Sequence, residues 1–138
     1  MIHPFVIYFK EAGELKHLNY VIISECKTHY AVAFYLFITN LIKMLQTKFS
    51  RIDKIIYMTD GTGAQYKNRH NFINLYMHQL DFGIVAEWHF HATAHGKGPY
   101  DGIGGTIKRK AARESLTRPL KNQITNAKQL FDQHEYFL

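Results

Sequence analysis

Two apolar runs rich in β-branched and aromatic residues, Phe5–Phe9 and Leu18–Ser24, lie near the N-terminus. The polar segment between them contains Gly13, so the pattern predicts an antiparallel hairpin in which this glycine supplies the turn. The longest apolar stretch follows and continues to about Phe49, with apolar side chains on nearly every side of the expected helix. A helix of this kind is expected to be covered on more than one side.

Strand-like and helix-like patterns then alternate along the rest of the chain. The expected elements are a strand over Ile52–Thr59, a helix over Asn71–Leu80, a strand over Ile84–His91, a helix over Ile103–Leu116 and a short helix over Lys121–Phe131. The core-facing stripes of the two longer helices are Phe72, Leu75, Tyr76 and Leu80 in the first, and Ile103, Ile107 and Ala111 in the second. This order predicts an α/β fold in which an antiparallel hairpin and parallel strands form one mixed sheet. We expect residues 1–138 to form a single domain.

The composition narrows the classes of partner and compartment. A formal charge of +6 and a pI near 9.4 favour a polyanionic partner or an anionic surface. The single cysteine, Cys26, cannot form an internal disulfide, which fits a reducing compartment. The stretch Ala31–Leu45 is too short and too often interrupted by polar residues to span a bilayer. We expect a nuclear or cytoplasmic protein that is not secreted and has no membrane partner.

Two acids lie where α/β proteins usually bind ligands. Asp60 follows a predicted buried strand, and Asp101 lies at the entrance of a predicted helix. Carboxylates suit Mg²⁺ or Mn²⁺, although an Asx turn at Asp60 and a helix cap at Asp101 are alternatives. Glycines crowd the segment before that helix, which indicates a loop that approaches a ligand closely. The residues expected in this structural loop are His95, Gly96, Gly98, Gly102, Gly104 and Gly105.

Basic residues are concentrated beside this loop. The segment from Lys97 to Lys121 holds seven basic and two acidic residues. Such a face suits phosphate contacts, which give salt-sensitive affinity without base specificity. The candidate nucleic-acid contacts are Lys97, Lys108, Arg109 and Arg113, together with Gln65, Lys67, Asn68 and Arg69 beside Asp60.

Two spaced motifs carry a resemblance to a known family. They are Thr59-Asp60-Gly61 with Gln65–Arg69, and Glu87–Phe90 with His95–Gly98, Asp101-Gly102, Gly104-Gly105 and Lys108-Arg109. The chain from His3 to about Pro119 resembles transposase-derived, RNase H-like (DDE-type) proteins of animal mobile elements, with 120–138 as a helical tail. The resemblance implies a Mg²⁺-dependent site for DNA cleavage and strand transfer, with Asp60 and Asp101 as catalytic acids and metal ligands.

The chain departs from the resembled family at its N-terminus. The first strand of the RNase H-like order, which carries the first acid, has no counterpart here, so we expect a truncated copy with impaired catalysis. Its absence leaves sheet edges unpaired, which predicts possible self-association through them. A catalytically inactive module that binds DNA or protein on the same scaffold is the main alternative.

A zinc-binding hydrolase is a second alternative. His89, His91 and His95 form a His-x-His-x3-His pattern, and two histidines at this spacing on a strand can share a zinc ion with a third ligand. The alternation of Trp88 and Phe90 with the first two histidines indicates that the aromatic pair faces the core.

Overall fold

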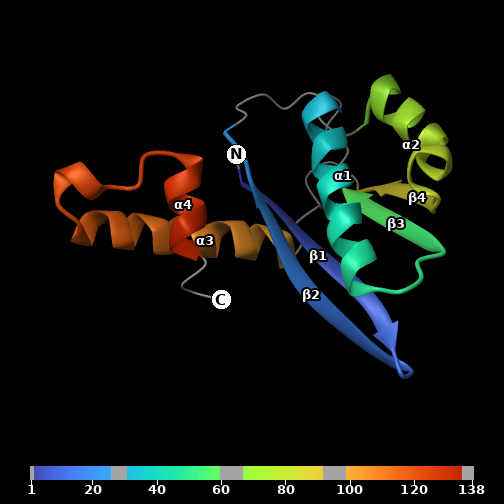
Figure 1. The fold of residues 1–138 in the computed structure, drawn as a ribbon, viewed down its shortest axis with the longest axis horizontal. Helices are drawn as coiled ribbons and strands as arrows, with labels where there is room; N and C mark the ends of the chain where they lie inside the picture. The colour runs from blue at the N-terminus through green and yellow to red at the C-terminus, as the bar shows by residue number, and fades with distance from the viewer. Residues whose placement is uncertain (1, 26–30, 60–66, 92–98, 135–138) are drawn as a thin grey trace. The chain divides into compact units, whose positions relative to one another are not determined.

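Most of the expected elements are present in the computed structural model, which describes residues 2–25, 31–59, 67–91 and 99–134. In chain order they are β1 (Ile2–Glu11), β2 (Glu14–Ile23), α1 (Ala31–Lys48), β3 (Lys54–Thr59), α2 (Arg69–Phe82), β4 (Val85–Phe90), α3 (Pro99–Thr117), a 3-10 helix η1 (Leu120–Asn122) and α4 (Ala127–His134) (Figure 1). The order of elements matches the prediction, and the α/β class is confirmed.

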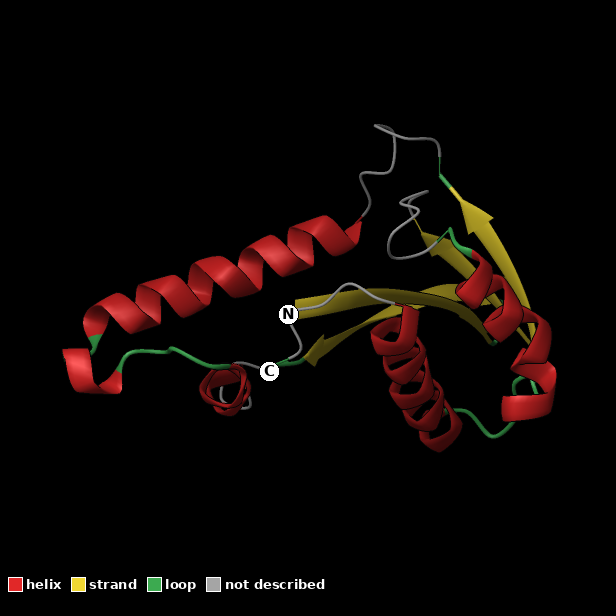
Figure 2. Cartoon of the chain, turned by 90° about the horizontal axis from the view of Figure 1, so that it is seen from above, coloured by secondary structure: helices red, strands yellow, loops and turns green. Residues whose placement is uncertain are grey.

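The strands of the described residues form two separate two-stranded sheets. β1 and β2 pair antiparallel over their whole length, whereas β3 and β4 pair parallel and are joined through α2. Figure 2 shows the same chain with its helices in red and its strands in yellow. The prediction of one mixed sheet therefore differs from the structure. Among the described residues, no strand joins the hairpin to the parallel pair by backbone hydrogen bonds, so the two pairs form separate sheets.

The chain divides into two compact units. The first consists of Met1–Lys27 and Gly98–Leu138, and the second of Thr28–Lys97. The hairpin, α3 and α4 thus belong to one unit, and α1, α2 and the parallel strands belong to the other.

In the hairpin unit, α3 packs on β1 and α4 packs on β2. Ile107 is buried on the inner face of α3, and Ile103 and Ala111 are half-buried beside it, so the predicted stripe of this helix is confirmed. A Cβ on Gly104 would meet Pro4 Cγ at 3.7 Å, which places this glycine at the contact between α3 and β1. The residues expected to form a tail thus include a helix that packs on the sheet.

The hairpin turn has two residues, because Glu11 pairs with Glu14. Gly13 has φ +81°, so the prediction that it supplies the turn is confirmed. Ala12 has φ +51° and is the only described non-glycine residue with positive φ. A Cβ disfavours this left-handed conformation, so Ala12 is a strained position in a turn type that prefers asparagine or glycine there.

Replacing Ala12 with asparagine is expected to raise the free energy of unfolding by about 1 kcal/mol, because asparagine tolerates the left-handed region better than alanine. Urea denaturation followed by circular dichroism measures the change. Ala12→Val is the matched control and should lower stability, since a β-branched side chain fits this conformation worst. Equal stability of the two variants would contradict the assigned turn.

In the parallel unit, α1 buries one face. Phe34, Phe37 and Ile42 lie in the core, whereas Val32 and Leu36 are exposed. The expectation that this helix is covered on more than one side is therefore wrong for the described residues. Within the described residues, no helix is both long and apolar enough to cross a membrane.

The orientation of α2 differs from the prediction. Asn71 and His78 are buried, whereas Tyr76 and Leu80 of the expected core stripe are exposed. The helix turns its polar residues inward because hydrogen-bond partners are available there, as described below. Sequence periodicity identified the helix correctly but assigned the wrong face to the core.

Candidate nucleic-acid interface

The two predicted metal ligands belong to different units. Asp60 directly follows β3 and lies outside the described residues, whereas Asp101 lies in the first turn of α3 with its side chain outside the described part. Other predicted site residues also lie outside the described residues, namely Gln65, His95, Gly96, Lys97 and Gly98. Among the described residues, no group of three histidine, cysteine or acidic side chains could hold a metal ion. The magnesium site therefore stays a prediction.

The start of α2 holds three predicted nucleic-acid contacts. Asn68 is the N-cap, because its Oδ1 accepts a hydrogen bond from the backbone N–H of Asn71 at 3.0 Å. This bond satisfies one of the free donors at the helix start, so Asn68 has a structural role. Lys67 is exposed, and its Nζ lies 5.9 Å from the centroid of the Phe90 ring. Arg69 is exposed, and both cations are accessible to an anionic ligand.

Aromatic rings pack against one another near the ends of β3 and β4, beside Lys67. Phe90 stacks on Trp88 with ring centroids 5.5 Å apart, and Phe72 meets Phe90 edge-on at 6.0 Å. The indole Nε1 of Trp88 donates a hydrogen bond to Thr59 Oγ1 at 2.9 Å. Thr59 and Phe90 are register partners, so β3 and β4 end at the same level. Trp88 and Phe90 pack against other aromatic rings, as predicted, and both are half-buried.

A buried hydrogen-bond chain joins β3 to α2. The imidazole Nδ1 of His78 lies 2.6 Å from the carbonyl oxygen of Ile84, and its Nε2 lies 2.8 Å from the hydroxyl of Tyr57. A carbonyl can only accept, so Nδ1 carries the proton, and in the neutral ring Nε2 accepts from the hydroxyl. A cavity of about 20 Å³ lies beside this hydrogen-bond chain and is lined by both Tyr57 and His78. It has room for about one water molecule and is too small for a substrate.

Alkaline pH is expected to destabilise the parallel unit through Tyr57. Burial raises the pKa of this phenol above its ordinary value. An unfolded tyrosine ionises near pH 10, so the stabilising contribution is fully present below that pH and is lost as the pH rises beyond it. Urea unfolding at a series of alkaline pH values measures the loss. Tyr57→Phe is the control and should show a shallower decline; parallel declines would contradict the assignment.

α3 begins earlier than the sequence predicts. The expected start is Ile103, whereas the helix spans Pro99–Thr117, so Gly102, Gly104 and Gly105 are helical rather than part of a loop. The prediction of a structural loop is therefore wrong for these three glycines. Pro99 explains the earlier start, because proline is favoured in the first turn of a helix. Packing of Gly104 against Pro4 gives the helix tertiary support that glycine propensity does not provide.

The outer face of α3 is cationic. Lys108, Arg109 and Arg113 are exposed, and the two arginines are separated by one turn and therefore share a face. A guanidinium nitrogen of Arg109 donates to Thr106 Oγ1 at 3.2 Å, which holds the side chain along the helix. The geometry suits contacts to successive phosphates of a nucleic-acid backbone.

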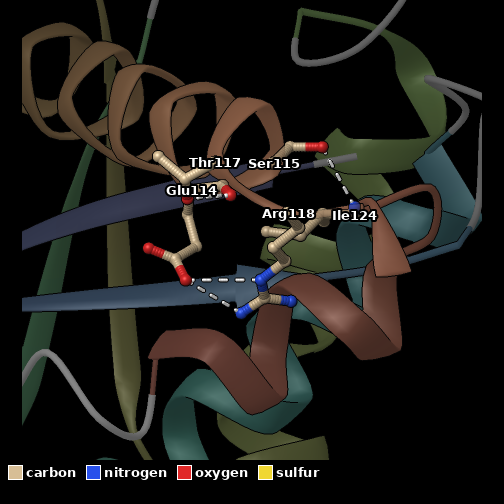
Figure 3. A network of polar contacts seen from close by, with 5 residues as sticks. All are labelled: Glu114, Ser115, Thr117, Arg118 and Ile124. Atoms are coloured by element: carbon tan, nitrogen blue, oxygen red, sulfur yellow. Dashed lines mark hydrogen bonds and ion pairs between the residues drawn. The ribbon is translucent and has the colours of Figure 1, made fainter. Parts of the chain in front are cut away.

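At the end of α3, the carboxylate of Glu114 is paired with a neighbouring arginine, Arg118. Arg118 donates from Nε and a terminal nitrogen to one oxygen of Glu114 at 3.3 and 3.2 Å, and Ser115 Oγ accepts from the backbone N–H of Ile124 at 3.1 Å (Figure 3). Glu114 is the only acidic side chain described on α3, and Arg118 neutralises it. The charge of the outer face is therefore not cancelled from within the described helix.

A family model matches residues 1–136, nearly the whole chain and both units; its description is "Domain of unknown function (DUF8701)". The chain belongs to the DUF8701 family. No curated protein and no solved structure matches it significantly. The family assignment leaves the resemblance to transposases as a proposal.

Gly102, near the start of α3 in this DUF8701 chain, is exposed like Lys108, Arg109 and Arg113. A Cβ there would meet no heavy atom within 4 Å, so Gly102→Ala is expected to stabilise the helix by about 1 kcal/mol. If the bare backbone is needed to approach a ligand, the same variant should bind DNA more weakly. Thermal unfolding and DNA binding measured together separate the two effects. Lower stability in Gly102→Ala would contradict the helical assignment.

Among the described residues, no three side chains of the kind that bind zinc lie together, so the structure adds nothing to the hypothesis of a zinc-binding hydrolase. His95 lies outside them, and His89 contacts Glu87, with 3.0 Å between Nε2 and Oε1. Hydrogen bonds from Lys54 and His89 hold the pKa of Glu87 below its ordinary value. Glu87 thus forms an ion pair with Lys54 and a hydrogen bond with His89 on the exposed face of the parallel strands. Zinc binding by this chain stays a prediction.

Sequence analysis missed the Tyr57–His78 pair. The available signal was a histidine of α2 that lies seven positions after Asn71. That spacing corresponds to two helical turns and places both polar residues on one face. A polar row of this kind within an amphipathic helix can indicate a buried network rather than a solvated face.

Proposed function

We propose that this DUF8701 chain binds the backbone of DNA through the outer face of α3 and derives from a DDE-type transposase. The observation that carries the proposal is the exposed group Lys108, Arg109 and Arg113 on a helix whose described carboxylate is already paired. Contacts of this kind neutralise phosphates and release counterions, so binding is salt-sensitive and carries little base specificity. The proposal implies a nuclear location.

Lys67, just before α2, gives this proposal further support. It is exposed beside the N-terminus of a helix, where backbone N–H groups and the helix dipole favour an anion. The net charge of +6 acts in the same direction, because it attracts a polyanion at long range.

We also propose that the ancestral chemistry was Mg²⁺-dependent phosphodiester cleavage and strand transfer. Carboxylate oxygens of Asp60 and Asp101 are suitable ligands for Mg²⁺ or Mn²⁺, and the bound ion would activate the attacking oxygen. A two-metal site of this class uses three acids, and the resemblance identifies only Asp60 and Asp101 in this sequence. We therefore propose that cleavage is impaired in this chain and that DNA binding is the retained activity.

Fluorescence anisotropy with a labelled DNA duplex tests the proposed binding. We expect affinity that falls steeply with salt and differs little between unrelated sequences. Salt-independent binding, or no binding at low salt, would overturn the proposal. Tight binding of a single sequence against unrelated competitors would overturn the proposed lack of base specificity.

Metal dependence distinguishes the enzyme from an inactive module. Binding of Mg²⁺ and Mn²⁺ is measured by isothermal titration for the wild type, Asp60→Asn and Asp101→Asn. Metal-dependent nicking of DNA that is lost in Asp60→Asn would support an active enzyme. Duplex binding without metal binding would instead support the inactive module.

A further inference from the structure

The outer face of α2 carries an exposed apolar row. Ile73, Tyr76 and Leu80 are 56%, 86% and 78% exposed. Their spacing of three and four residues places them on one stripe, which continues to Arg69 at the start of the helix. The opposite face contains the buried residues Asn71 and His78. The row is therefore a continuous surface rather than a set of scattered apolar side chains.

The charged side chains at both ends of α2 have the sign that the helix dipole disfavours. Arg69 and His70 lie in the first turn, which has no acidic residue, and Asp81 lies in the last turn, which has no basic residue. Cations are unfavourable at a helix N-terminus and anions at a C-terminus. Asp81 accepts a hydrogen bond from the hydroxyl of the half-buried Tyr35 at 3.2 Å. The stability of the isolated helix does not account for this arrangement of charges.

We propose that α2 is an interface with a second copy of this chain, in which the two α2 helices pack antiparallel about a two-fold axis near Tyr76. This arrangement places Ile73 opposite the partner's Leu80. It also brings Arg69 within side-chain reach of the partner's Asp81, less than one helical turn along the axis. Each contact occurs twice, as two-fold symmetry requires.

A second copy fits this surface because the charges of two α2 helices are complementary when the helices pack antiparallel and not when they pack parallel. Antiparallel packing places the positive end of each helix beside the negative end of the other, so both the dipoles and the side-chain charges attract. A parallel pair would place like charges side by side. The apolar row is short, which predicts a concentration-dependent dimer rather than a permanent one.

Sedimentation velocity across a wide range of protein concentration tests the interface with Leu80→Glu. We expect the wild type to change from monomer to dimer and Leu80→Glu to remain monomeric, because the charge would be buried between two apolar rows. Leu116→Glu is the matched control, since Leu116 is 81% exposed on α3, and this variant should still dimerise. A monomeric wild type at every concentration would overturn the proposal. A dimer that survives Leu80→Glu would also overturn it and would support association through the sheet edges.

A charge swap tests the antiparallel orientation. Arg69→Asp and Asp81→Arg should each weaken the dimer by about tenfold or more, because like charges then face each other twice, and the double variant should restore it. Both single changes favour the helix dipole, so lost dimerisation cannot be attributed to an unfolded helix, and circular dichroism checks this. Failure of the double variant to recover dimerisation would overturn the antiparallel arrangement.

Discussion

Replacing His78 with alanine is expected to lower the free energy of unfolding by about 3 kcal/mol. The imidazole is buried and bridges the hydroxyl of Tyr57 and the carbonyl oxygen of Ile84. The substitution leaves a cavity and removes the hydrogen-bond partner of two groups that water does not readily reach, and each loss carries a cost. Chemical denaturation monitored by circular dichroism measures the difference from the wild type.

Two further variants show whether the hydrogen-bond chain is responsible. His70→Ala removes an exposed histidine from the same helix and should change stability by less than about 0.5 kcal/mol. Tyr57→Phe keeps the ring and removes only the hydroxyl, so it should cost about 1–2 kcal/mol. The effects of Tyr57→Phe and His78→Ala should be less than additive in the double variant, because both remove the same contact. Full additivity would contradict a shared hydrogen bond.

Changing Lys108, Arg109 and Arg113 together to glutamine is expected to reduce affinity for duplex DNA on the order of a hundredfold at moderate salt. Each side chain is proposed to neutralise one phosphate, so the slope of log affinity against log salt should become shallower by about 2.7. All three residues are exposed, and the hydrogen bond from Arg109 to Thr106 is a surface contact at 3.2 Å, so folding should be preserved. Anisotropy titrations at several salt concentrations give both values.

A control with the same change in net charge separates a local surface from general attraction. Lys10, Lys43 and Lys48 are exposed on other elements, and their triple glutamine variant loses the same charge. It should change the salt slope little, because these side chains are not proposed to contact phosphates. Equal losses in the two triple variants would show that binding depends on net charge and would contradict an interface on α3.

Local sequence patterns predicted the elements well because the forces that create them are local. Gly13 indicated the hairpin turn, since a two-residue turn needs positive φ. The repeat of Ile103, Ile107 and Ala111 identified both α3 and its buried face. Alternation in β4 correctly assigned Trp88 to packing. The exposure of Lys108, Arg109 and Arg113 also follows from their residue type, because long charged side chains rarely lose water.

Other features depended on contacts that no local pattern contains. Periodicity showed that α2 has two unlike faces, but contacts with distant residues decided which face is buried. Tyr57 and the carbonyl oxygen of Ile84 supply the hydrogen bonds of the buried His78. Tyr76, on the other face, stays exposed. Likewise, glycine content predicted a loop at Gly104, whereas packing against Pro4 favours a helix there.

The sequence by itself therefore determined the order of elements, the α/β class and the cationic segment that suggests a nucleic-acid partner. Only the tertiary structure decided the pairing of the strands into two sheets, the early start of α3 and the inward face of α2. The physical reason is that helix and turn formation depend on neighbours in sequence. Burial of a polar group depends instead on whether a distant residue supplies its hydrogen bond.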